Sequence, residues 1–253
     1  MKQPAGPMKT KSPNRFLRIV HAFFFSLWIV VSVGLIASLV IVLRPISRWI
    51  SLALMKLCFI LAIVFSGVRI EITGAEKIDR KRNYIFMSNH TSAADIAILY
   101  VACPVFISFL AKRELFFIPI LGWGMAAGGH IPINRKNPKS ARRSIERAIK
   151  ALRSGKTSLV VFPEGTRSQT GELGDFKLGV FSLAVQSGTP VVPVAVRGSR
   201  DVLPKGSYFM NPAPVSVSFG DPVSVSGFDR KNKGVLAKIV RDKVEELLRQ
   251  RTT

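Results

Sequence analysis

Two long apolar segments near the N-terminus most constrain how this chain can fold. The first, Phe23–Leu43, contains no charged residue, and the second, Trp49–Val68, contains only Lys56. A helix of about 20 apolar residues is long enough to cross the roughly 30 Å hydrocarbon layer of a bilayer. A short basic sequence, RPISR, separates the two segments. This pattern predicts a membrane-embedded helical hairpin within residues 16–70, preceded by a basic, disordered tail over residues 1–15.

A cleaved signal peptide is the first alternative for the leading segment, because basic residues precede it. However, the apolar run exceeds a usual signal core, no A-x-A site follows, and a second apolar segment comes at once. Basic residues flank both segments and fill the turn, so a membrane-spanning hairpin and one that dips into a single leaflet fit equally well. In both cases we expect the rest of the chain at the cytoplasmic face of a membrane, which would be the inner membrane in a bacterium.

The net charge of +22 arises from 37 Lys and Arg residues against 15 Asp and Glu residues. Such a charge favours an anionic partner, such as anionic membrane lipids, a phosphorylated substrate or an acidic carrier. A membrane-anchored nucleic-acid-binding protein is a much weaker alternative, since only three Trp and three Tyr are available to interleave with the basic residues. Cys58 and Cys103 have no partner at metal-ligand spacing, so both are interpreted as packing residues.

Beyond the apolar segments, short predicted strands alternate with helical patterns. The strands are rich in β-branched and aromatic residues and lie at residues 84–88, 105–111, 130–134, 158–162, 191–196 and 215–219. The clearest helix spans Pro138–Arg153, with Asn137 as its cap and Gly155 after its end. A last helix covers residues 236–248. Residues 71–253 are therefore predicted to form one α/β domain.

The sequence NHTSAADI places His90 five residues before Asp95, directly after a predicted strand. Residues five apart in a continuous helix diverge by about 140°, so these two meet only if His90 lies in the turn that precedes the helix. Thr91 or Ser92 would then cap that helix. The Asp95 carboxylate would fix one ring nitrogen and leave the other free to accept a proton. No G-x-S-x-G motif supplies a serine nucleophile, so a substrate hydroxyl is the expected proton donor. A structural histidine and a helix-start aspartate form the alternative.

The sequence VFPEGTRS predicts an anion-binding loop after another apolar strand. Gly165 permits a tight turn that exposes Glu164, Thr166 and Arg167. Hydroxyl and backbone N–H donors beside a guanidinium suit the geometry of a phosphate group. An ordinary polar surface turn is the alternative. Arg135, just past the strand in GGHIPINR, is a further candidate anion contact.

Two other residues near these motifs receive structural interpretations. His130 has no carboxylate close to it in the sequence and is predicted to be structural. Pro193, in VVPVAV, is unusual for a central strand and predicts a sheet edge or a bulge.

Four motifs in a fixed order resemble those of the glycerolipid acyltransferases, specifically the bacterial type of 1-acylglycerol-3-phosphate acyltransferase. They are N-H-x-x-x-x-D in NHTSAAD, GHIPINR, FPEGTRS, and V-P-V in VVPVAV. The segments AKREL and FKLG also resemble parts of that family. Each motif alone is weak to moderate, whereas four in order behind an apolar hairpin are specific. The resemblance covers about residues 83–196 and implies a mixed sheet flanked by helices.

The resemblance implies that His90 is a general base oriented by Asp95. His90 would deprotonate the free hydroxyl of lysophosphatidate, which attacks an acyl thioester and yields phosphatidate. Acyl-CoA or an acidic acyl carrier protein would be the donor, with no metal and no further cofactor. The residues implied to hold the phosphate and glycerol are Lys112, Arg135, Glu164, Gly165, Thr166 and Arg167, and Pro193 would shape the acyl region. An acyltransferase for another lyso-lipid, such as a lyso-ornithine lipid, is an open alternative, because the motifs specify the reaction better than the head group.

Overall fold

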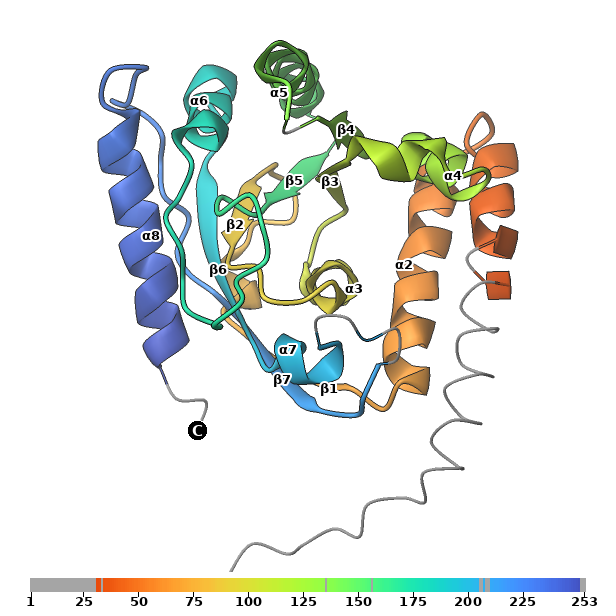
Figure 1. Cartoon of the computed structure of the whole chain (residues 1–253). Coiled ribbons are helices and arrows are strands. Elements are labelled where there is room, and N and C mark those ends of the chain that lie inside the picture. Colours follow the sequence, from red (N-terminus) through yellow and green to blue (C-terminus); the bar gives the residue numbers. More distant parts are fainter. Residues whose placement is uncertain are drawn as a thin grey trace, which may run out of the picture.

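A seven-stranded sheet forms the centre of the molecule (Figure 1). The computed structural model describes residues 31–32, 34–134, 136–155, 157–204, 207 and 210–250. The strands are β1 (Arg69–Thr73), β2 (Ile85–Ser88), β3 (Ile107–Lys112), β4 (Ile131–Ile133), β5 (Ser158–Val161), β6 (Val191–Arg197) and β7 (Pro214–Phe219). Their spatial order is β1-β7-β6-β2-β5-β3-β4. All neighbours are parallel except β6 and β7, so the sheet is mixed, as the resemblance implies.

Helices cover both faces of this sheet and give the domain three layers. The helices are α2 (Arg48–Phe65), α3 (Ala94–Ala102), α4 (Leu121–Ala127), α5 (Pro138–Arg153), α6 (Leu178–Ser187), α7 (Ser199–Val202) and α8 (Lys233–Arg249), with short 3-10 helices η1 (Ala75–Lys77) and η2 (Arg113–Phe117). One apolar core joins the sheet to α2 and α3, and a second joins it to α5, α6 and α8. Figure 1 shows these two groups of helices on opposite sides of the sheet.

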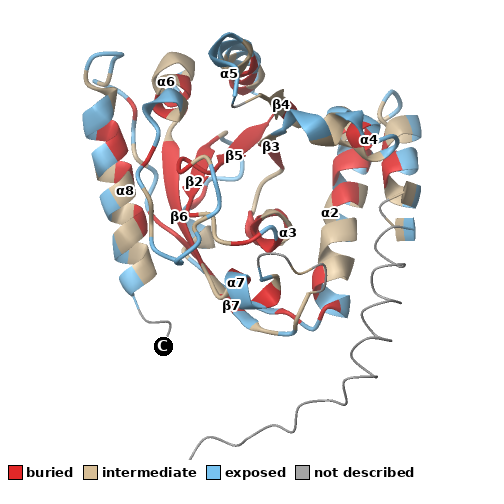
Figure 2. Ribbon diagram, in the orientation of Figure 1, coloured by how far each residue is buried: buried red, intermediate tan, exposed pale blue. Residues whose placement is uncertain are grey.

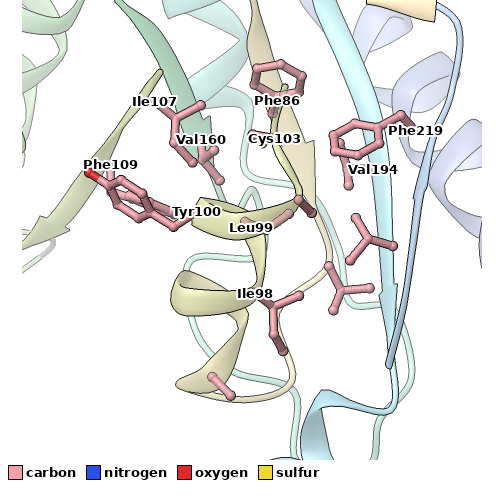
Figure 3. Close-up of a cluster of buried hydrophobic side chains, with 14 of the residues drawn as sticks. Phe86, Ile98, Leu99, Tyr100, Cys103, Ile107, Phe109, Val160, Val194 and Phe219 are labelled. Atoms are coloured by element: carbon pink, nitrogen blue, oxygen red, sulfur yellow. The ribbon is translucent and has the colours of Figure 1, made fainter. Parts of the chain in front are cut away.

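Alternate residues of the central strands enter the two cores. Phe86 of β2 packs toward α3, whereas its neighbours Ile85 and Met87 pack toward the helices of the opposite layer. This is the period-two alternation that a strand imposes on its side chains. Figure 2 shows the buried residues concentrated in the sheet, and Figure 3 shows Phe86 with Ile98 and Leu99 of α3 in one cluster of buried side chains. Because full burial of such a side chain contributes about 1.5–3 kcal/mol, β2 and α3 hold the turn between them in place.

The predicted α/β architecture is confirmed. All six predicted strands are present, with boundaries that agree within two residues. Helix α5 has the predicted bounds, and Asn137 Oδ1 accepts a hydrogen bond from the Ser140 N–H at 2.9 Å. The sequence analysis does not predict β1, because its sequence RIEIT is short and places mostly exposed residues at the sheet edge.

For Pro193, the sequence predicts a sheet edge or a bulge, and the sheet edge is wrong. The residue lies in β6, between β2 and β7, so the predicted sheet edge is incorrect. The predicted bulge is present. Val194 pairs with Phe219 and Val191 pairs with Val223, so three steps along β6 oppose four along the other strand. The extra residue belongs to the segment that follows β7, opposite Pro193, which itself has no N–H to donate.

The apolar helix Gly34–Leu43 lies beside α2, as expected for a hairpin (Figure 1). Ser51 Oγ of α2 donates a hydrogen bond to Val40 O at 3.4 Å. Helix α4 lies close to both helices, since a Cβ on Gly124 would lie 2.7 Å from Ala37 Cβ and one on Gly128, at the end of α4, would meet the Met55 side chain of α2. The hairpin is therefore attached to the α/β domain through α4 as well as through the packing of α2 on α3.

Helix α2 is long and apolar enough to cross a membrane, judged by length and composition. Its outer side exposes large apolar side chains, including Trp49, Leu57 and Val64. Lys56 does not face that side freely, because its Nζ donates to Cys103 O at 2.9 Å. Embedding in a membrane and the predicted domain boundaries stay predictions, and the tail over residues 1–15 and the start of the first apolar segment lie outside the described residues.

His130 has a structural environment, as predicted. The Phe109 N–H donates to His130 Nδ1 at 3.1 Å, so the ring proton is on Nε2, which donates to the Tyr100 hydroxyl at 3.0 Å. Tyr100 in turn donates to Met55 Sδ at 3.0 Å. Burial lowers the pKa of His130 to about 4, which keeps the ring neutral. The histidine thus links β3, α3 and α2.

The buried neutral ring predicts a loss of stability in acid. An unfolded histidine gains its proton below its ordinary pKa of 6.5, whereas His130 in the fold resists protonation down to about 4. Its stabilising effect is therefore complete above pH 6.5 and decreases by about 3 kcal/mol as the pH falls to 4. We expect the melting temperature of His130→Asn, measured in detergent, to fall less between pH 7.5 and 4.5 than that of the wild type. Equal decreases would contradict this role.

Candidate active site

His90 and Asp95 lie at the carboxyl end of β2, in the turn that leads into α3. His90 Nδ1 is 2.7 Å from Asp95 Oδ2. Asp95 is fully buried in the first turn of α3, whereas the His90 side chain keeps 12% of its surface exposed. The same Oδ2 accepts the backbone N–H groups of Thr91 and Ser92, both at 2.9 Å. The structure therefore brings the two residues together, and one carboxylate oxygen organises the whole turn.

A stacked aromatic ring also fixes the His90 side chain. The ring centroids of His90 and Phe162 are 3.9 Å apart, and their planes differ by 14°. Phe162 immediately follows β5, which is adjacent to β2 in the sheet. The hydrogen bond at Nδ1 and this stacking contact together fix the orientation of the ring, and therefore the direction in which Nε2 points. Nε2 makes no hydrogen bond within the part of the chain that the structure describes.

The backbone of the His90 turn is clamped by the loop that follows β5. The His90 N–H donates to Glu164 Oε1 at 2.8 Å, and the Gly174 N–H donates to Glu164 Oε2 at 3.0 Å. The Ser168 N–H donates to His90 O at 2.8 Å. Glu164 is buried, so its carboxylate joins two backbone segments. Its contact with glycerol or phosphate, which the resemblance implies, stays a prediction.

The neighbouring strand β6 holds the other side of the same turn. Asn89 Nδ2 donates to Val196 O at 2.9 Å, and the Val196 N–H donates to Asn89 Oδ1 at 2.8 Å. At the start of α3, the Ala94 N–H donates to Ser92 Oγ at 3.1 Å. The predicted cap by Thr91 or Ser92 is wrong in position, because the N-cap residue of α3 is Ala93 and no side chain caps the helix there.

The other predicted anion contacts lie along the same edge of the sheet. Lys112 ends β3 and is exposed, with its ammonium 3.9 Å from a neighbouring glutamate. Gly165 has a φ of 74°, which glycine adopts without strain, and Thr166 and Arg167 beside it are exposed. Because β2, β5 and β3 are parallel neighbours, the segments that follow them project from one edge. Arg135 lies outside the described residues.

Three residues of this site are missed by the sequence analysis. Lys177 covers Gly165 so closely that a Cβ there would lie 2.8 Å from Lys177 Nζ. The segment FKLG contains this lysine, but its spacing does not show that it returns to the loop. Phe162 and Asn89 stand inside recognised motifs, yet their contacts cross between strands and cannot be derived from local spacing.

The arrangement can transfer a proton next to a cationic surface. A buried carboxylate fixes the tautomer of His90 and can stabilise its protonated form, so Nε2 can accept a proton from a hydroxyl. Lys112, Arg167 and Lys177 are exposed cations on the same edge. Among the described residues, no group of three or more His, Cys, Asp or Glu side chains is placed to hold a metal ion.

Comparison with known proteins shows the family to which this chain belongs. The model of the family described as Acyltransferase matches residues 69–197, about half of the chain. The chain belongs to the acyltransferase family. A family relative from Borreliella burgdorferi, a 1-acyl-sn-glycerol-3-phosphate acyltransferase, is 33% identical over 200 residues, which is 78% of this chain and 79% of that protein.

Two further members of the acyltransferase family extend the comparison. A Limnanthes alba 1-acyl-sn-glycerol-3-phosphate acyltransferase is 34% identical over 182 residues, and the match spans 72% of this chain but only 64% of the plant protein. The crystal structure of the 1-acyl-sn-glycerophosphate acyltransferase PlsC from Thermotoga maritima superposes with a TM-score of 0.80 and 26% identity. It covers 94% of this chain and 99% of that structure, so the similarity in fold includes nearly the entire molecule.

The clamp made by Glu164 predicts how this acyltransferase-family member responds to its loss. In Glu164→Gln, one carboxylate oxygen becomes an NH₂ group, so either the His90 or the Gly174 N–H loses its acceptor. Hydrogen bonds to charged groups contribute about 1.5–3 kcal/mol, so the melting temperature should fall by several degrees. The turnover number should fall by about tenfold or more, because the His90 turn moves.

Glu172→Gln, on the exposed part of the same loop, is the matched control and should change neither quantity. A Glu164→Gln protein with unchanged melting temperature and a raised KM for the acyl acceptor would instead indicate direct substrate contact. That result would contradict the clamp.

Proposed function

We propose that this protein is a 1-acylglycerol-3-phosphate O-acyltransferase. It transfers a fatty acyl group from a thioester carrier, acyl-CoA or acyl carrier protein, to the free hydroxyl of lysophosphatidate and produces phosphatidate. The observation that carries the proposal is the 2.7 Å contact between His90 Nδ1 and the fully buried Asp95 carboxylate at the edge of the sheet that also presents Lys112 and Arg167. The activity for which the relatives from Limnanthes alba, Borreliella burgdorferi and Thermotoga maritima are named supports the same choice of substrate.

In the proposed reaction, His90 acts as the general base. Its Nε2 takes the proton of the acceptor hydroxyl while the hydroxyl oxygen attacks the thioester carbonyl carbon. Asp95 stabilises the imidazolium that forms, because its carboxylate accepts the Nδ1–H. The tetrahedral intermediate then collapses, the carbon–sulfur bond breaks, and the imidazolium returns its proton to the departing thiolate. The products are the ester, the free thiol carrier and the regenerated neutral histidine.

We assign the phosphate and glycerol of the acceptor to Lys112, Arg135, Gly165, Thr166 and Arg167. Fixing the phosphate places the free hydroxyl at His90 Nε2, and this alignment contributes more to the rate than general affinity does. Glu164 participates by positioning the backbone of His90, in addition to any contact with glycerol. The role of Pro193 in shaping the acyl region is part of the same proposal.

The surroundings of the site suit substrates that reside in a membrane. Beside the hairpin, the segment of η2 and α4 exposes Phe117, Ile118, Ile120 and Trp123. Contiguous exposed apolar residues of this kind mark membrane or partner contacts. Helix α5 presents a basic outer surface, which suits an acidic carrier protein or the phosphates of coenzyme A. We therefore place the enzyme at the cytoplasmic face of a membrane that contains anionic lipids.

A panel of acyl acceptors tests the substrate. Purified full-length protein in mixed micelles is given an acyl-CoA or acyl carrier protein donor with lysophosphatidate, lysophosphatidylcholine, glycerol 3-phosphate or a lyso-ornithine lipid. We expect kcat/KM to be highest for lysophosphatidate, because it alone combines an acyl chain with a terminal phosphate. A higher value for the lyso-ornithine lipid would replace this proposal by the alternative acceptor.

Replacement of His90 tests the mechanism. General-base catalysis typically contributes about 10²–10⁴-fold, so His90→Ala should lower kcat at least roughly a hundredfold. The melting temperature and detergent behaviour should be retained. The control is His130→Asn, which changes the other histidine of the domain and should lower kcat far less, because His130 is bonded on both nitrogens within the core. Near-normal turnover in a folded His90→Ala protein would refute the role.

A further inference from the structure

A second cationic site lies on the opposite side of the domain from His90. It is a surface pocket of about 450 Å³ at the amino ends of the parallel strands, where residues just before β2, β3 and β5 line it. Asn83 lines the pocket just before β2, and His90 follows the other end of β2, seven residues further along a largely extended chain. That separation corresponds to about 20 Å. The pocket is therefore distinct from the proposed acyl-transfer site.

Four cations line this pocket: Lys56 of α2 and the consecutive residues Arg80, Lys81 and Arg82. No carboxylate is among the described residues that line it, and none of the four cations forms an ion pair within the described ranges. Asp79, the acidic residue that directly precedes Arg80 in the sequence, accepts a hydrogen bond from the Lys81 backbone N–H at 2.9 Å. Four like charges around one concave surface favour a bound anion.

The partly buried Lys56 gives this pocket an ordered inner wall. Its Nζ is held by Cys103 O at 2.9 Å, which occupies one of its three donors. The carbonyl is neutral, so the charge of Lys56 is not cancelled. The remaining donors have no partner among the described residues and lie beside the three exposed cations. An ammonium held by a hydrogen bond next to exposed guanidinium groups is a suitable phosphate contact.

The outer wall of the pocket is aromatic and continuous with the apolar hairpin. The rings of Trp49 and Phe106 lie 5.5 Å apart, and Trp49 is 62% exposed. Ile46 and Ile50, on either side of Trp49 in the sequence, are also exposed. Tryptophan is enriched where protein crosses the boundary between lipid and water. A ligand in this pocket can therefore place a phosphate among the cations while its apolar part lies along α2.

From these observations we infer that the pocket formed by Lys56, Arg80, Lys81 and Arg82 beside Trp49 binds the phosphate of an anionic phospholipid of the surrounding membrane. This binding is non-catalytic, because the site lies at the edge of the sheet opposite His90. It retains the enzyme on membranes rich in anionic lipid and orients the domain on α2. Basic pockets beside membrane helices bind anionic head groups in the same manner.

Binding can be measured on the full-length protein in a neutral detergent. Dihexanoyl phosphatidylglycerol, kept below its micellar concentration, is titrated while tryptophan fluorescence is followed. Trp49→Phe identifies the part of the signal that comes from the pocket. We expect a saturable Trp49 signal with this lipid. We expect none with dihexanoyl phosphatidylcholine, and only weak binding with inorganic phosphate, because neither combines net charge with an apolar part.

Removal of pocket cations should abolish most of the affinity. In Arg80→Ala/Arg82→Ala, the dissociation constant should rise about thirtyfold, since each Lys or Arg near an anionic lipid contributes about a factor of five. Lys56→Met, which keeps the length and apolar packing of the side chain, should weaken binding by about fivefold. Lys231→Ala/Lys238→Ala removes the same net charge from exposed positions of the loop before α8 and of α8 itself and should leave binding unchanged within twofold.

Three results would overturn the proposal. Unchanged phosphatidylglycerol binding in both pocket variants would exclude these cations, and an equal loss in the Lys231→Ala/Lys238→Ala control would reduce the effect to general charge. Inorganic phosphate that produced the Trp49 signal at the same concentration as the lipid would make this a site for soluble phosphates instead.

Discussion

One carboxylate oxygen, Asp95 Oδ2, determines the geometry of the proposed active site. It accepts the ring N–H of His90 and the backbone N–H groups of Thr91 and Ser92. A buried carboxylate is costly unless hydrogen bonds satisfy it. The three donors satisfy Oδ2, whereas the buried Oδ1 has no hydrogen-bond partner among the described residues. The same bonds bend the chain between β2 and α3 and fix the tautomer of the histidine. The hydrogen bonds that fold this turn therefore also orient the His90 ring, the proposed general base.

The sheet supplies rigidity on both sides of this turn. Glu164, from the loop after β5, accepts the His90 backbone N–H, while Asn89 pairs with the backbone of β6. Since β5 and β6 are the two strands adjacent to β2, the turn is held from both neighbours. Support of this kind, from backbone bonds on packed strands, keeps a catalytic group within a fraction of an ångström of its working position.

The sequence predicts the framework of this molecule better than the contacts within it. Strand positions, α5 and the meeting of His90 with Asp95 follow from hydrophobic period, capping residues and turn geometry, all of which are local. The arrangement of segments that are distant in the sequence is not predicted. The polar strand β1 is missed, and Pro193 lies in a central strand instead of at an edge. The contact of Glu164 with the backbone N–H of His90 is also not predicted. These features depend on which strands become neighbours, and spacing along the chain does not contain that information. The cationic pocket beside Trp49 is likewise assembled from four separate segments.

The central claim is that Asp95 acts on catalysis only through His90, and a double-mutant cycle tests it most directly. The turnover number is measured with lysophosphatidate for the wild type, His90→Ala, Asp95→Asn and the double variant, each verified as folded by its melting temperature. The account predicts strong non-additivity, so that the double variant loses no more than about threefold beyond His90→Ala alone. Losses that multiply, with Asp95→Asn lowering kcat as much without His90 as with it, would contradict the account.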